Sequence, residues 1–78
     1  MNHRFGLNRL SVGKKATVKS LNMTGSIRRR LLDIGLVENT PVECVGKSPS
    51  GDPAAYRIRG TIIAIRSEDS ANIIVEPR

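Results

Sequence analysis

The chain has a single cysteine, Cys44, and a single histidine, His3, among its 78 residues. One cysteine cannot form an intramolecular disulfide, and one cysteine with one distant histidine cannot build a metal cage. Domains of this size bury only about 60% of the surface that the unfolded chain exposes, so their stability is small. Residues 1–78 are therefore predicted to form one small domain that is stabilised by side-chain packing alone.

Segments rich in β-branched residues make up most of the chain. Residues 15–21 alternate between two faces, which is typical of a half-buried strand. Residues 48–53 contain two prolines and a glycine and predict a loop. The further strands are expected at residues 41–45, 55–58, 61–66 and 73–76, with a single helical turn at 67–71.

The position of Gly60 leaves two arrangements open for the strands on either side of it. A simple bend would leave Ile63 and Ile65 in water. A two-residue hairpin turn at 59–60 would place the large apolar residues of both strands on one face and Arg57 on the other. We expect the hairpin because it buries the larger apolar set, although the turn lacks the preferred Asn-Gly pair. The residues on the buried face are then Tyr56, Ile58, Ile63 and Ile65.

A helix is predicted between the first and second of these strands. Thr24 or Ser26 is expected to cap its start, and Gly35 is placed as the left-handed residue that ends a helix. Leu36 would then cover the last turn. The apolar residues at helical spacing are Ile27, Leu31 and Ile34. One helix and five short strands predict a mainly β fold, a small and strongly bent five-stranded β-barrel with one α-helix inserted after the first strand.

The charge of the chain indicates acidic partners. Lysine and arginine total 13 against 7 aspartates and glutamates, which gives a formal net charge of +6. Such an excess favours nucleic acid, an anionic membrane or an acidic protein. No apolar run approaches the ~20 residues that span a bilayer, and residues 1–15 lack the apolar stretch of a signal peptide. We therefore expect a cytoplasmic protein.

The sequence contains no recognisable catalytic set. Cys44 lies in a predicted strand without an activating base beside it, and His3 lies near the terminus. The glycines match neither a dinucleotide-binding nor a phosphate-binding loop. We expect no enzymatic activity, no cofactor and no metal site.

Three consecutive arginines, residues 28–30, are the distinctive feature of the predicted helix. At about 100° per residue, Leu32 lies off the main apolar stripe and has Arg28 beside it. Either the buried face is wide and the Arg28 stem lies along it, or Leu32 is partly exposed and offers an apolar contact with a cationic rim. Arg29 and Asp33 face water together, and we expect Arg29 or a basic strand residue to compensate Asp33.

Nucleic-acid binding by this small barrel is the alternative function. Arginines 28, 29, 57 and 59 could bind phosphates at non-specific strength. Base stacking has little support, because Phe5 and Tyr56 are the chain's only aromatic residues.

Four segments together resemble the FeoA family, ferrous iron transport protein A. They are the Arg-Leu-Leu-Asp-Ile-Gly-Leu run at 30–36, the loop at 48–53, the glycine and strand at 60–66, and the Ile-Ile-Val run at 73–75. The resemblance covers about residues 7–76. It implies an SH3-like barrel and a cytoplasmic accessory protein that binds and modulates FeoB, a membrane ferrous iron transporter with a cytoplasmic GTPase domain.

Two segments depart from the family pattern. Glu38 and Asn39 stand where the family usually has Pro-Gly, and asparagine is the best substitute for glycine in a left-handed turn. Ser70 replaces the usual alanine of the short helical turn. We expect both changes to leave the fold intact.

The partner-binding residues predicted from the helix geometry and the hairpin are Arg28, Arg29, Leu32 and Arg57. Arg30 is expected to serve the fold. A partly exposed Leu32 or an open edge of the barrel could also support weak self-association.

Overall fold

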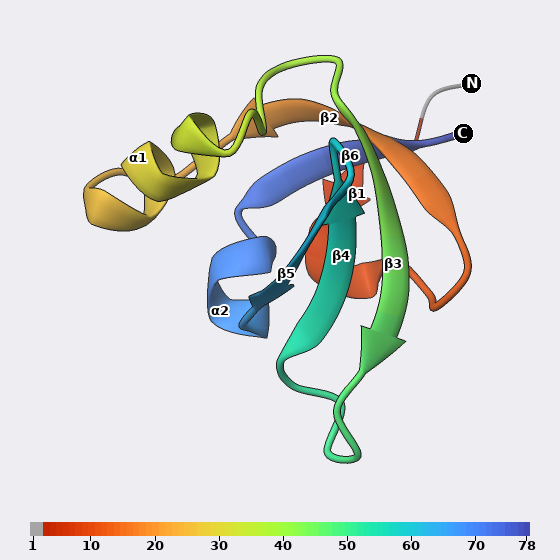
Figure 1. Ribbon diagram of the computed structural model, residues 1–78. Coiled ribbons are helices and arrows are strands. Elements are labelled where there is room, and N and C mark those ends of the chain that lie inside the picture. The colour runs from red at the N-terminus through yellow and green to blue at the C-terminus, as the bar shows by residue number, and fades with distance from the viewer. Residues whose placement is uncertain (1–2) are drawn as a thin grey trace.

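The computed structural model describes residues 3–78, which form one antiparallel six-stranded sheet with the strand order β1-β6-β2-β3-β4-β5 (Figure 1). The predicted mainly β fold with a helix after the first long strand is confirmed. The sheet does not close into a complete barrel, since β1 and β5 are its edges. The elements are β1 (Phe5–Gly6), the 3₁₀ helix η1 (Leu7–Arg9), β2 (Lys15–Leu21), α1 (Ser26–Asp33), β3 (Pro41–Lys47), β4 (Ala54–Ile58), β5 (Thr61–Ile65), α2 (Ser67–Ser70) and β6 (Ile73–Pro77).

The sheet has one more strand than predicted. The additional strand is β1, which has only two residues. Phe5 pairs with Val75 and Gly6 pairs with Ile74, which adds this short segment to the outer edge of β6. Two residues are too few to show an alternating pattern, so the sequence gives no strand signal here.

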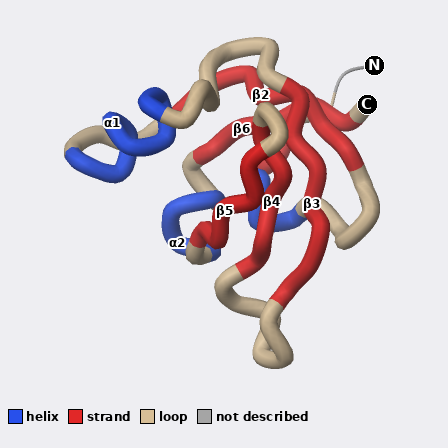
Figure 2. Tube along the Cα trace, viewed as in Figure 1, coloured by secondary structure: helices blue, strands red, loops and turns tan. Residues whose placement is uncertain are grey.

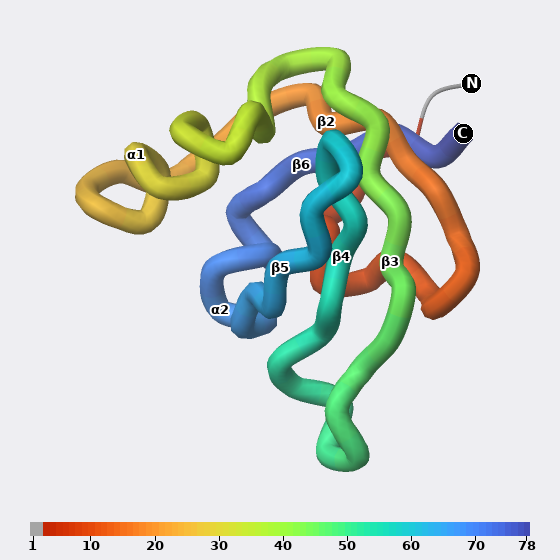
Figure 3. Tube along the Cα trace, viewed as in Figure 1, coloured from red at the N-terminus to blue at the C-terminus, as the bar shows by residue number. Residues whose placement is uncertain are grey.

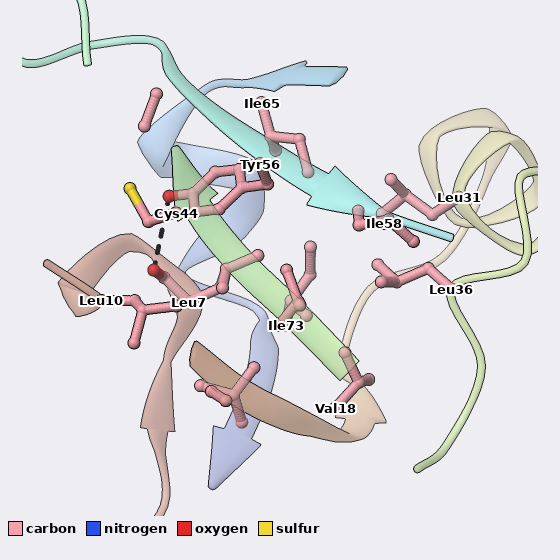
Figure 4. Close-up of a cluster of buried hydrophobic side chains, with 14 residues drawn as sticks. Leu7, Leu10, Val18, Leu31, Leu36, Cys44, Tyr56, Ile58, Ile65 and Ile73 are labelled. Carbon is pink, nitrogen blue, oxygen red and sulfur yellow. Dashed lines mark hydrogen bonds between the residues drawn. The ribbon is translucent and has the colours of Figure 1, made fainter. Parts of the chain in front are cut away.

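The core lies inside the bent sheet, where strands, η1 and the end of α1 contribute apolar side chains (Figure 4). Tyr56 is buried, and its hydroxyl donates a hydrogen bond of 3.4 Å to the carbonyl oxygen of Leu7. The lone Cys44 is also buried. The largest of the remaining buried side chains are Leu7, Leu31, Leu36, Ile58, Ile73, Val18, Val42 and Val75.

The predicted hairpin at residues 59–60 is confirmed. Ile58 pairs with Thr61 and Tyr56 pairs with Ile63, so the chain reverses within two residues (Figure 3). Both turn residues have positive φ angles, 50° for Arg59 and 80° for Gly60, as a hairpin turn that follows the sheet twist requires. The expected inward set is found, with Tyr56, Ile58 and Ile65 buried and Ile63 half-buried.

The end of α1 is fixed by the predicted glycine. Gly35 has a φ of 93°, its N–H donates to the carbonyl of Leu32 at 2.9 Å, and the N–H of Leu36 donates to that of Leu31 at 2.9 Å. This pair of bonds is the Schellman motif. Leu31 and Leu36 are both fully buried, as the sequence predicted.

The start of α1 differs from the prediction. The N-cap residue is Gly25, with a φ of 83°, and no side chain caps the helix. Thr24 lies outside the cap position and Ser26 is already the first helical residue, so neither accepts a bond from the first turn.

The two departures from the family pattern leave the backbone intact. Asn39 has a φ of 72°, so it adopts the expected left-handed conformation. Ser70 is buried in α2, and its hydroxyl donates to the carbonyl of Ser67 at 3.5 Å.

Candidate partner-binding surface

Helix α1 extends from one side of the sheet (Figure 2), and its residues Ile27 and Leu31 face the core. Leu31 is the one residue of its eight that is fully buried. Ile27 is half-buried against the core, whereas Arg28 and Arg29 are exposed. The helix therefore presents its basic first turn to solvent.

Three of the four predicted binding residues meet in one open hollow on this helix. Arg28, Arg29 and Leu32 line it, and Leu32 is half-buried. The geometry therefore matches the second sequence interpretation, a partly exposed leucine with a cationic rim. The other lining residues are Thr24, Gly25, Ser26 and Asp33, and the hollow has a volume of about 640 Å³.

The charges in the first turn of α1 oppose the helix dipole. A helix is stabilised by acidic residues in its first turn and by basic residues in its last turn. Here the first turn has no acidic residue, and the last turn holds the favourable Arg30 together with the unfavourable Asp33. No ion pair within residues 3–78 includes Asp33, so its expected compensation by Arg29 or a strand residue is not found. Helix stability does not explain this charge order.

Arg57, the fourth predicted residue, lies apart from the other three. It occupies β4 directly opposite Glu43 on β3, and its Nη1 donates to the Glu43 carboxylate at 3.1 Å. The two side chains remain 51% and 27% exposed. Arg57 lines a different open hollow of about 550 Å³, which shares no residue with the hollow on α1. The cations around this second hollow are Lys15, Arg57, Arg59 and Arg78.

Arg59 has a structural role that the sequence analysis missed. Its Nε donates to the carbonyl oxygen of Gly35 at 2.9 Å, and the Thr40 hydroxyl donates to the same oxygen at 3.2 Å. A Cβ on Gly35 would collide with the Arg59 side chain. The hairpin turn and the end of α1 are thus joined by one arginine. Gly35 and Arg59 are far apart in sequence, and no local pattern reveals their contact.

Residues 3–78 contain no cluster of metal-ligating side chains. No three of the histidine, cysteine and carboxylate side chains lie close enough together to hold a metal ion. Burial raises the pKa of the Tyr56 hydroxyl above its ordinary value of 10.0, which matches a structural core residue. No helix in this range is both long enough and apolar enough to cross a bilayer.

Comparison with known proteins gives a consistent family. Residues 5–77 match the FeoA domain family. A protein of Porphyromonas gingivalis, described as a Fe(2+) transport protein A/Fe(2+) transporter FeoB fusion protein, is 34% identical over 70 residues. Those residues are 90% of this chain and 8% of the fusion protein, so the chain corresponds to a small part of that relative.

Solved structures of similar proteins share the fold. A FeoA-like protein from Clostridium acetobutylicum superposes with a TM-score of 0.86 at 34% identity, over 99% of this chain and 90% of the other. FeoA of Stenotrophomonas maltophilia, solved as a zinc complex and described as a prokaryotic SH3 domain protein, superposes with a TM-score of 0.73 at 28% identity. That match covers 96% of this chain and 88% of the other. The predicted SH3-like fold is confirmed.

Proposed function

The chain belongs to the FeoA family of ferrous iron transport proteins, and from this membership we propose that it is a non-enzymatic accessory protein that docks on a FeoB-type transporter. The docking surface is the hollow on α1, and the partner is the cytoplasmic part of the transporter, which places this chain in the cytoplasm. The fusion of the two proteins in the Porphyromonas gingivalis relative supports this pairing. Docking would modulate the transporter's conformation or its GTPase cycle.

The unfavourable charge of the first turn of α1 is the observation that carries the proposal. Arg28 and Arg29 occupy the first helical turn, where cations are unfavourable for the helix, and they remain exposed. Their position is explained if an acidic partner surface covers them. The net charge of +6 would steer such a partner toward the chain.

Leu32 gives the hollow an apolar centre. Binding interfaces typically combine a buried apolar or aromatic anchor with arginines, while the surrounding contacts exclude water. A half-buried leucine between Arg28 and Arg29 provides both elements on one small surface. We therefore assign Leu32 as the apolar anchor of the contact.

Arg57 would form a second and separate contact point. Because it lines another hollow, a partner that contacts all four residues has to span both surfaces. Its ion pair with Glu43 also has to open or to be shared with the partner. We expect Arg57 to contribute less to docking than the residues of α1.

The nucleic-acid alternative has little aromatic support on the surface. Tyr56 is 1% exposed, so its ring cannot stack on a base, and Phe5 is half-buried against the core. The exposed arginines could still bind phosphates with strong salt dependence.

The test is an amide-resolved NMR titration of the labelled chain with the cytoplasmic GTPase domain of the cognate transporter. Docking predicts shifts centred on residues 24–36, with weaker shifts around Arg57. The double variant Arg28→Glu/Arg29→Glu and the variant Leu32→Ala should each weaken binding at least tenfold. Arg9→Glu, which changes an exposed arginine on η1, serves as the matched control and should bind as the native chain does.

Salt distinguishes the proposal from the alternative. A contact with an apolar centre should lose less affinity between about 50 and 200 mM salt than phosphate binding, which collapses over this range. The absence of shifts with the GTPase domain, together with binding of an RNA or DNA oligonucleotide at the same arginines, would refute docking in favour of nucleic acid.

A further inference from the structure

Strand β5 is an open and unprotected edge of the sheet. It pairs with β4 only, and its five residues, Thr61–Ile65, include no charge and no proline. Its pairing with β4 has no bulge. Natural edge strands usually carry charges, prolines or bulges, because an exposed flat edge can pair with other chains. Ile62 on this edge is 58% exposed.

The hairpin geometry determines which backbone groups are free. In a two-residue turn, Ile58 and Thr61 form a hydrogen-bonded pair, and bonded and non-bonded pairs then alternate along an antiparallel ladder. Thr61, Ile63 and Ile65 therefore direct their N–H and C=O groups toward β4. Ile62 and Ala64 direct theirs outward, where no strand pairs with them.

A hollow of about 330 Å³ lies beside this edge, between α1 and α2. Figure 1 shows β5 at the border of the sheet, with α1 to its upper left and α2 to its lower left. Two exposed arginines line the hollow, Arg30 from α1 and Arg66 after β5, against one carboxylate, Asp69. No ion pair within residues 3–78 includes either arginine. The apolar lining residues are Ile27, Pro53, Ala64 and Ile65.

We propose that β5 binds an extended acidic segment of a partner protein, which adds a seventh strand to the sheet through the backbone of Ile62 and Ala64. Strand addition of this kind derives its affinity from main-chain hydrogen bonds and its specificity from alternate side chains. Alternate apolar side chains would enter the hollow, and acidic ones would reach Arg30 and Arg66.

A single strand fits this place better than a second copy of the chain. Ile27 and Arg30 of α1 line the hollow, so this helix borders the space beside β5 into which a second sheet would have to enter. Two copies would each carry a net charge of +6 and repel one another, whereas an acidic segment is attracted. The inference goes beyond docking through α1, since the hollow beside β5 shares no residue with the hollow of Arg28, Arg29 and Leu32.

The probe is a five-residue peptide of alternating glutamate and valine, acetylated and amidated, titrated into the labelled full-length chain. Strand addition predicts amide shifts at residues 61–66 and at Arg30. A peptide with lysine in place of glutamate should bind at least tenfold more weakly. Methylating one alternate set of peptide amides should abolish binding, while methylating the other set should not, because only one set faces β5.

The matched protein variants are Ala64→Pro and Ala64→Ser. Proline removes an outward N–H that β4 does not use, so the hairpin ladder stays intact, while serine keeps that N–H. We expect a loss of about tenfold or more in peptide affinity for Ala64→Pro and little change for Ala64→Ser. Ile62→Pro is the second proline variant, and native-like amide spectra establish that each variant is folded.

The outcomes separate the possibilities. Equal binding by Ala64→Pro and Ala64→Ser, or no shifts at residues 61–66 with millimolar peptide, would overturn the proposal. So would light scattering that detects a dimer which Ala64→Pro abolishes, because the edge would then bind a second copy. Leu32→Ala weakens docking through α1 without changing the charge of the chain, so it should keep its peptide affinity, and a failure of docking remains distinguishable from a failure of strand addition.

Discussion

The sheet and helix α1 show two different relations between sequence and stability. In β4, alternate residues are buried, so packing in the core accounts for the residue types at these positions. In α1 one residue of eight is fully buried, no side chain caps the start, and the arginines of the first turn oppose the dipole. The sheet is built for packing, while the first turn of α1 carries residues that stability does not require. This difference identifies where a partner contact is expected.

Of the substitutions in α1, Leu31→Ala should lower the free energy of unfolding most. Leu31 is fully buried against the core, and such truncations cost about 2–5 kcal/mol in the free energy of unfolding. In a domain this small, that is much of the total stability. Urea denaturation followed by circular dichroism measures the loss.

Leu32→Ala is the matched control for this measurement. Leu32 is the neighbouring residue of the same type but only half-buried, so its truncation should cost about 1 kcal/mol or less. Equal losses at the two positions would contradict the assignment of Leu31 to the core and Leu32 to a surface. If Leu31→Ala does not fold, Leu31→Met preserves most of the volume and keeps the comparison measurable.

The sequence predicted the parts of the fold that depend on local patterns. Alternation predicted β2, the hairpin at Arg59 and Gly60 was expected from its apolar residues, and Gly35 indicated the helix end. The start of α1 was predicted wrongly, because Gly25 reaches the N-cap conformation without the side-chain bond on which the prediction relied. The pattern of β1 is too short to detect.

The candidate site was predicted less completely than the fold. The helical wheel placed Arg28 and Leu32 together, since both lie on one helix. It could not show that Arg57 lines a separate hollow, because that depends on how the sheet bends. The bond between Arg59 and Gly35 joins residues that are distant in sequence and was missed for the same reason.

Gly35→Ala tests the contact between the end of α1 and the hairpin turn of the sheet, where Arg59 bonds to Gly35. Gly35 has a φ of 93°, and an alanine in this conformation costs about 1–2 kcal/mol. The new Cβ would also displace the Arg59 side chain. We expect a loss of at least this size in the free energy of unfolding, measured by urea denaturation.

A double-mutant cycle with Arg59→Ala sharpens this test. Removing the Arg59 side chain also removes the collision, so the double variant should lose less than the sum of the two single losses. Gly46→Ala is the control, since Gly46 has open space around its Cα. Strict additivity would mean that hairpin and helix end are not coupled through this contact.

The buried hydroxyl of Tyr56 provides a pH test of the core. Burial raises its pKa above 10.0, so the folded chain keeps the proton where the unfolded chain loses it. Its contribution to stability is complete below about pH 10 and is lost as the pH rises through the raised value. Tyr56→Phe should cost about 0.5–1.5 kcal/mol at neutral pH through loss of the bond to Leu7.

Comparing the alkaline part of the profile between the native chain and Tyr56→Phe isolates the contribution of this tyrosine. Between pH 9 and 11, unfolding midpoints of the native chain should fall more steeply than those of Tyr56→Phe. Parallel profiles would show that the hydroxyl is not desolvated in the folded chain.

The smallest expected effect on stability belongs to Arg28→Glu/Arg29→Glu, the same double variant that should weaken docking at least tenfold. Both side chains are exposed, and exposed substitutions usually change the free energy of unfolding by less than about 0.5 kcal/mol. The sign is informative, because acidic residues in the first turn favour the helix dipole and relieve repulsion with Arg30. We therefore expect a thermal midpoint equal to that of the native chain or slightly higher.

A large loss of stability would show that these arginines support the fold, and the case for a partner surface on α1 would fail. A slight gain, together with lost docking, would mean that the chain carries these two arginines for its partner at the expense of its own helix.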